Sequence, residues 1–120
     1  MSRMKPENCD RILLFKHESA IQMILEGRKK MEIRGRHYRA GKFLLGHKGV
    51  IHGAVKLGPA VLIQSHLAFE RYRPRHHYEI GPRDKLPYKT TFGMPILEVE
   101  KLNVPFRHPQ GAISIVKYRP

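Results

Sequence analysis

The residues best suited to chemistry are concentrated in one ten-residue segment, Gly27-Arg28-Lys29-Lys30-Met31-Glu32-Ile33-Arg34-Gly35-Arg36. Ammonium, carboxylate and guanidinium groups follow one another closely there. Glu32 can hold Arg34 or Lys30 through a charge-assisted hydrogen bond, which would leave Lys29 to meet an anion. The pattern therefore indicates a ligand site. It equally fits a solvated edge strand whose charges prevent aggregation.

A second basic segment interleaves guanidinium groups with flat rings: Arg71-Tyr72-Arg73-Pro74-Arg75-His76-His77-Tyr78. Arginine can hold phosphate while a tyrosine or histidine stacks on an exposed base, which is the combination that single-stranded RNA requires. A solvated basic loop is the alternative. We favour contact with nucleic acid, because charge and stacking surface occur together.

The histidines do not predict a metal site. His76 and His77 are adjacent, and neither forms a helical pair with ligand spacing. Further ligands would have to come from elsewhere in the chain, and no carboxylate stands at a suitable spacing. We expect no metal and no other cofactor. The other histidines considered as ligands are His47, His52 and His66.

The composition points to a polyanionic partner. The chain of 120 residues has 23 Lys and Arg against 10 Asp and Glu, a formal net charge of +13. Such an excess attracts nucleic acid through counterion release. No apolar run approaches the roughly 20 residues of a membrane span. We therefore expect no membrane contact. The lone Cys9 can form no intramolecular disulfide, which fits a reducing compartment, so we expect a cytoplasmic protein.

The two basic segments need elements to position them. Residues 1–10 predict a disordered lead, and 11–118 a single domain. Alternating and apolar patterns predict about six strands and two short helices, hence an α+β fold with a mixed sheet curled into a small barrel. The expected strands are 11–15, 30–34, 42–47, 50–57, 92–104 and 111–118; the helices are 17–27 and 65–73, with a loop over 74–89.

The first segment also resembles a known motif. Gly27, Lys29, Glu32 and Arg34 match the Gly-x-Lys-x-x-Glu-x-Arg pattern of the ASCH domain, a PUA-like β-barrel, and a helix precedes the motif as in that family. The likeness extends over 11–118, through Ile51-His52-Gly53-Ala54-Val55 and the pattern Val104-Pro105-Phe106 followed by Gly111-Ala112-Ile113.

This resemblance implies a cleft that binds RNA or a modified nucleoside. Some similar proteins hydrolyse N4-acetylcytidine with the motif lysine as base, a threonine as nucleophile and a glutamate as acid, and others are ribonucleases. Lys29 matches that lysine, whereas Glu32 stands where those enzymes have threonine. Glu70, and after it Glu79, is the nearest match to the acid.

We therefore predict RNA or nucleotide binding, with hydrolysis of RNA or of an acylated cytidine as the alternative. The candidate catalytic residues are Lys29, Glu32 and Glu70. The candidate ligand-binding residues are Lys29, Lys30, Arg34, Arg36, Arg71, Tyr72, Arg73 and Arg75.

Overall fold

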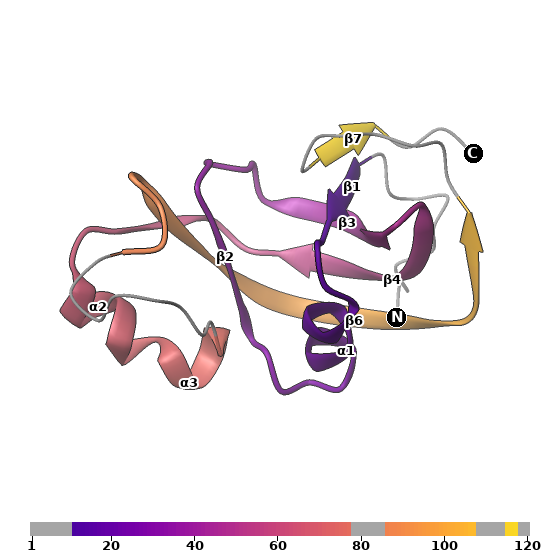
Figure 1. Ribbon diagram of the computed structural model, residues 1–120, viewed down its shortest axis with the longest axis horizontal. Coiled ribbons are helices and arrows are strands. Elements are labelled where there is room, and N and C mark those ends of the chain that lie inside the picture. Colours follow the sequence, from indigo (N-terminus) through magenta and orange to yellow (C-terminus); the bar gives the residue numbers. More distant parts are fainter. Residues whose placement is uncertain (1–10, 78–85, 108–114, 118–120) are drawn as a thin grey trace.

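A curled, mixed sheet dominates the computed structural model, which describes residues 11–77, 86–107 and 115–117 (Figure 1). The strands run in the order β2-β6-β4-β3-β1-β7, with β5 paired to β6. Only β1 and β3 are parallel among these pairs. The strands are β1 (Arg11–Leu14), β2 (Met31–Arg34), β3 (Gly41–His47), β4 (Val50–Leu57), β5 (Val61–Ile63), β6 (Thr91–Arg107) and β7 (Ile115–Lys117); the helices are α1 (Glu18–Leu25), α2 (His66–Arg71) and α3 (Arg73–His76).

The prediction of an α+β fold, a small PUA-like barrel with short helices, is confirmed. The curled sheet forms a half-barrel. The described residues contain one strand more than expected. β5 is only three residues long and lies between Gly58-Pro59 and Ser65, so it is too short to show an alternating pattern. It joins the sheet by pairing with the start of β6.

The predicted loop from Pro74 is wrong at its beginning, because Pro74 lies inside α3. A proline in the first turn of a helix loses no hydrogen bond, since that N–H would have no intrahelical partner. Some expectations lie outside the described residues: the lead at 1–10, the part of the expected loop over 78–85 with Tyr78 and Glu79, and 111–114 and 118 of the last expected strand.

Helix α1 brings the chain to the start of β2. Ile21 and Ile24 are buried on one face, and Gly27 follows the helix with a φ of +78°, a conformation that glycine adopts readily. The N–H groups of Arg28 and Lys29 then both donate to the carbonyl oxygen of Met23, at 2.9 and 3.0 Å. These bonds fix the direction in which Lys29 leaves the helix.

The main core lies between α1 and the concave face of the sheet. Its buried side chains come from α1 and from four strands. Two of these strands, β3 and β4, form a hairpin that closes through Lys48 and Gly49, whose positive φ angles suit a tight two-residue turn. The buried members of this core are Leu13, Ile21, Ile24, Phe43, Leu45, Val55, Leu57 and Met94.

A smaller core fixes α2 to the other face of β2. Met31 and Ile33 pack there against Ile63 and Phe69. The alternation predicted for β2 therefore holds, with its apolar residues on one face and Glu32 and Arg34 on the other. None of the helices within the described residues is long and apolar enough to cross a membrane.

Candidate functional site

Three charged side chains meet in a buried ion-pair cluster, which we call the triad: Lys29, Glu32 and Arg34. The Nζ of Lys29 lies 2.9 Å from Oε1 of Glu32, and the Nε of Arg34 donates a 2.6 Å hydrogen bond to Oε2. The exposed fractions of these side chains are 8%, 4% and 12%, in chain order. One carboxylate thus holds two cations.

The partner of Glu32 differs partly from the one expected from the sequence. Arg34 does pair with it, but the second cation is Lys29, and Lys30 is exposed. Strand alternation begins only at Met31, because the preceding residues are turned by their bonds to Met23. This turn directs Lys29 inward.

The charge state of the triad follows from Glu32. Burial alone would raise the pKa of this carboxyl, but the charges of Lys29 and Arg34, with their hydrogen bonds, outweigh it and hold the pKa below 4.5. Glu32 is therefore ionised at neutral pH. Two cations and one carboxylate give the triad a net charge of +1 in a place with little access to water.

Arg34 is held from two sides. Its guanidinium carbon lies 4.7 Å from the centre of the Phe15 ring, while its Nε is bonded to Glu32. Within the described part of the chain, its two terminal nitrogens have no hydrogen-bond partner. The terminal donors of a fixed guanidinium are suited to phosphate or carbonyl oxygens.

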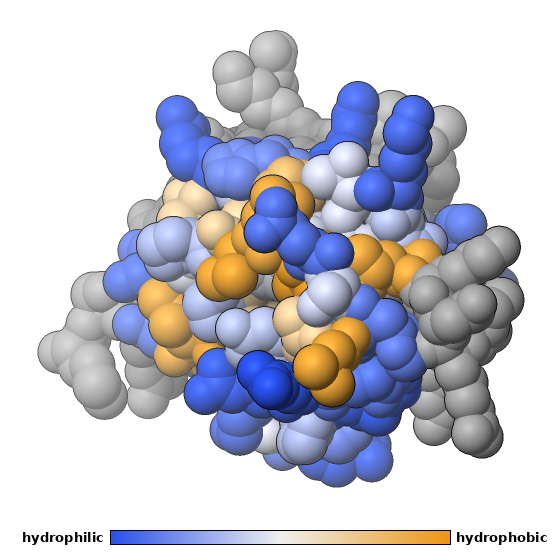
Figure 2. All heavy atoms as spheres, turned by 90° about the vertical axis from the view of Figure 1, so that its left-hand side faces the viewer, coloured by the Kyte–Doolittle hydropathy of each residue, from blue (hydrophilic) through white to orange (hydrophobic). Residues whose placement is uncertain are grey.

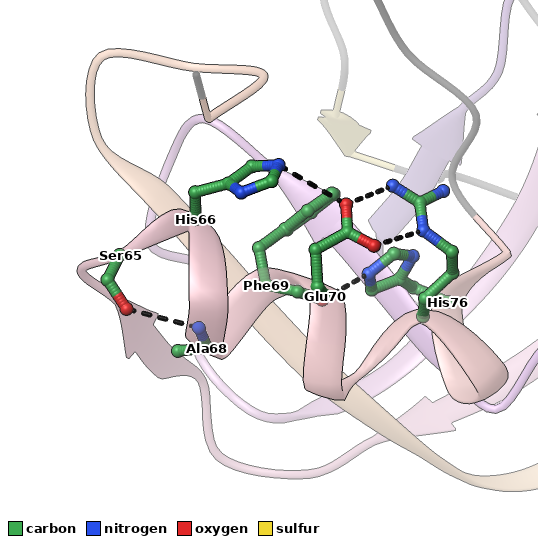
Figure 3. A network of polar contacts seen from close by, with 7 residues as sticks. Ser65, His66, Ala68, Phe69, Glu70 and His76 are labelled. Atoms are coloured by element: carbon green, nitrogen blue, oxygen red, sulfur yellow. Dashed lines mark hydrogen bonds and ion pairs between the residues drawn. The ribbon is translucent and has the colours of Figure 1, made fainter. Parts of the chain in front are cut away.

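The predicted acidic residue, Glu70, lies in a separate network on α2 and α3 (Figure 3). Arg73 donates to both of its oxygens, at 2.7 and 2.6 Å, and Nε2 of His66 lies 3.3 Å away. The hydrogen bond from Arg73 is the main reason why the pKa of Glu70 is lowered. The hydroxyl of Ser65 caps α2 by accepting a hydrogen bond from the N–H of Ala68, as the sequence predicted.

His76 is a residue whose position the sequence did not indicate. Its ring is fully buried, stacks on Phe69 with 4.2 Å between centroids, and donates from Nε2 to the carbonyl oxygen of Phe69 (Figure 3). Burial first, then the charges of Arg73 and Lys29, lower the pKa of His76. The described residues contain no group of three or more His, Cys, Asp and Glu placed for a metal ion.

A backbone bond joins the two basic segments. The N–H of Lys30 donates to the carbonyl oxygen of Arg75 at 2.7 Å, and the carbonyl oxygen of Lys30 accepts from Ile96 on β6. Tyr72 is half-buried against the smaller core. Figure 2 shows this end of the molecule, where hydrophilic side chains surround a few apolar ones. The exposed predicted ligand-binding residues are Lys30, Arg36, Arg71 and Arg75.

Comparison with known proteins supports the fold. No protein-family model matches the sequence, and no curated protein matches it either. The structure is similar to the crystal structure of a mutant of ZmASCH from Zymomonas mobilis, with a TM-score of 0.72. The match covers 91% of this chain and 87% of that chain at 12% sequence identity. The chain therefore has the ASCH-like fold that the motif implied.

Proposed function

We propose that this ASCH-like domain binds RNA or a nucleotide, with the triad as the centre of its ligand site. The observation that carries the proposal is the buried net charge of +1 on Lys29, Glu32 and Arg34. Burying an uncompensated cation costs free energy, so such clusters are more frequent where function requires them. An anionic group close to the triad would compensate this charge.

The surroundings of the triad favour a polyanion over a small anion. Lys30 and Arg75 are exposed and joined by their backbones, and Arg71 is exposed on the neighbouring helix. The whole chain carries a net charge of +13. A surface of this kind neutralises several phosphates and gains free energy from counterion release. Arg73 contributes less than the sequence suggested, because Glu70 holds its guanidinium.

Hydrolysis is less well supported by the charge states. A general acid must carry a proton at the working pH. The pKa values of both Glu32 and Glu70 lie below the ordinary value, so both are carboxylates at neutral pH. The ammonium of Lys29 is also engaged with Glu32, at 2.9 Å. These groups suit the recognition of charge better than proton transfer.

The experiment is a titration with fluorescent single-stranded RNA at several salt concentrations. The matched variants are Arg71→Ala/Arg75→Ala, at the proposed site, and Lys48→Asn/Lys101→Ala, which removes the same two exposed charges elsewhere. Asparagine suits the turn position of Lys48, whose φ is 49°.

We expect the first variant to lower the slope of log K against log salt by about 1.4, since each contact to a single strand contributes about 0.7. The second variant should retain the wild-type slope. Binding that ignores salt, or equal losses in both variants, would contradict the proposal.

A further inference from the structure

We infer that an unpaired nucleobase binds on a flat row of side chains that extends from the triad across three strands: Arg34, Phe92 and Leu62. This subsite rests on the proposed function and specifies its ligand as a single-stranded or free nucleotide. Phe92 and Leu62 are not part of the ASCH-type motif or of the two basic segments. Their placement becomes evident only from the strand register.

The register places the three side chains side by side. Arg34 on β2 is opposite Phe92 on β6, and Phe92 is in turn opposite Leu62 on β5. Directly opposed residues of antiparallel strands project to the same face, with Cβ atoms about 5 Å apart. The side chains of Arg34, Phe92 and Leu62 therefore leave the same face of the sheet next to one another.

Two members of this row, Phe92 and Leu62, are accessible. Leu62 is 47% exposed, which is a large fraction for a leucine within a sheet, and Phe92 is partly exposed. The exposed ring of His37 meets Phe92 edge to face, at 5.5 Å between centroids and an interplanar angle of 80°. The plane of the His37 imidazole is therefore nearly perpendicular to the plane of the Phe92 ring. A flat ligand can lie on Phe92 and Leu62 and contact His37 at its edge.

The chemistry of the row selects a base together with an anionic or carbonyl oxygen. Phe92 and Leu62 offer only apolar surface, which stacks on any base. The terminal nitrogens of Arg34, which have no hydrogen-bond partner among the described residues, can donate to the ligand. Bases inside an A-form duplex are stacked on one another and expose no face. The subsite therefore takes unpaired bases.

The test compares probes that differ only in their bases. A short oligouridylate, an abasic ribose-phosphate strand of the same length, and a duplex are titrated with the wild type, Phe92→Leu and Leu62→Ala. Val61→Ala is the matched control, because Val61 is similarly exposed, at 41%, but projects to the opposite face of β5. His37→Ala tests the row at an exposed residue that does not contribute to a core.

We expect Phe92→Leu to weaken oligouridylate binding about tenfold, with smaller losses in Leu62→Ala and His37→Ala. Abasic binding should be unchanged in all variants, and Val61→Ala should behave as the wild type. Competition by uridine monophosphate that is lost in Phe92→Leu supports a free nucleotide as ligand, and base-dependent binding without competition supports a strand.

Two results would overturn the inference while leaving the proposed function intact: equal wild-type affinity for the oligouridylate and the abasic strand, or base-dependent binding unaffected by the substitutions at Phe92, Leu62 and His37. If none of the probes showed salt-dependent binding, the proposed function would be overturned, and this inference with it.

Discussion

The backbone N–H of Lys30 donates a 2.7 Å hydrogen bond to the carbonyl oxygen of Arg75. This bond places the end of α3 beside the start of β2, although the two segments are far apart in the sequence. The exposed Arg75 of α3 is thereby held beside the residue that follows Lys29 of the triad, whereas α2 packs on the face of β2 opposite to Glu32 and Arg34. A ligand bound at the triad would also lie near Arg75.

The stability of the triad depends on its carboxylate. Replacing Glu32 by glutamine leaves Lys29 and Arg34 buried without an opposite charge, which we expect to cost about 3 kcal/mol of unfolding free energy. Urea denaturation measures this value. Glu26→Gln is the control, since it breaks the exposed ion pair with Arg28 and should change stability by less than about 1 kcal/mol. Equal losses of unfolding free energy in the two variants would contradict the prediction that the buried carboxylate contributes more to stability than the exposed one.

The same carboxylate predicts a dependence of stability on pH. The pKa of Glu32 is lower in the folded state than its ordinary value of 4.5. Its contribution is therefore complete above that value and is lost as the pH falls through the folded pKa. The difference in unfolding free energy between the wild type and Glu32→Gln should shrink below about pH 4.5. A difference that stays constant down to pH 3 would contradict the lowered pKa.

His76 should remain neutral at pH values just below its ordinary pKa of 6.5. Its pKa lies below 6.5, chiefly because the ring is buried, so its stabilising effect is present above pH 6.5 and declines as the pH falls. NMR titration of the imidazole protons of His76 measures the midpoint of its protonation. Because an imidazolium in this position would lie beside the charges of Arg73 and Lys29, a midpoint above 6.5 would be incompatible with the structure.

Replacement of His76 tests its role in positioning α3. His76→Ala removes the stacking on Phe69 and the bond to its carbonyl oxygen, and we expect it to cost about 2 kcal/mol. RNA affinity should also decrease, because α3 carries Arg75. His77→Asn is the matched control, as His77 is exposed and has a φ of 51°, which asparagine tolerates. Full RNA affinity in His76→Ala would show that this residue does not position α3 for RNA binding.

Incubation with N4-acetylcytidine tests the hydrolytic alternative. Since Glu32 and Glu70 are both ionised at neutral pH, we expect no release of acetate above the buffer rate at high protein concentration. Chromatography of the nucleoside products measures it, with Lys29→Ala as the control for contaminating activity. Turnover by the wild type that disappears in Lys29→Ala would favour hydrolysis over binding alone.

Local patterns predicted most of the fold. The helix ending near Gly27, the hairpin closing at Lys48-Gly49 and the cap at Ser65 each depend on residues close together in the sequence, and all three are present. β5 was missed because three residues cannot establish an alternation. The helical turn at Pro74 was missed because proline ends some helices and begins others.

The candidate site was less predictable, because its contacts are tertiary. Alternation placed Glu32 beside Arg34, but the inward turn of Lys29 depends on bonds to Met23 in the preceding helix. Glu70 and Arg73 are three residues apart, a local spacing at which side chains on a helical turn meet, so this pair did not depend on tertiary contacts. The row from Arg34 to Leu62 required the register of three strands. No spacing in the sequence determines such a register.

The most direct test of the central claim is to map RNA binding on the backbone by NMR. On titration with a short single-stranded RNA, we predict that the largest amide shift changes lie in Lys29 to Arg34, with others at Phe92 and in Arg71 to Arg75. The β3–β4 turn at Lys48 and Gly49 serves as an internal reference, because it lies outside the proposed site. Shift changes confined to that turn, or spread evenly over all exposed lysines and arginines, would contradict a ligand site centred on the triad.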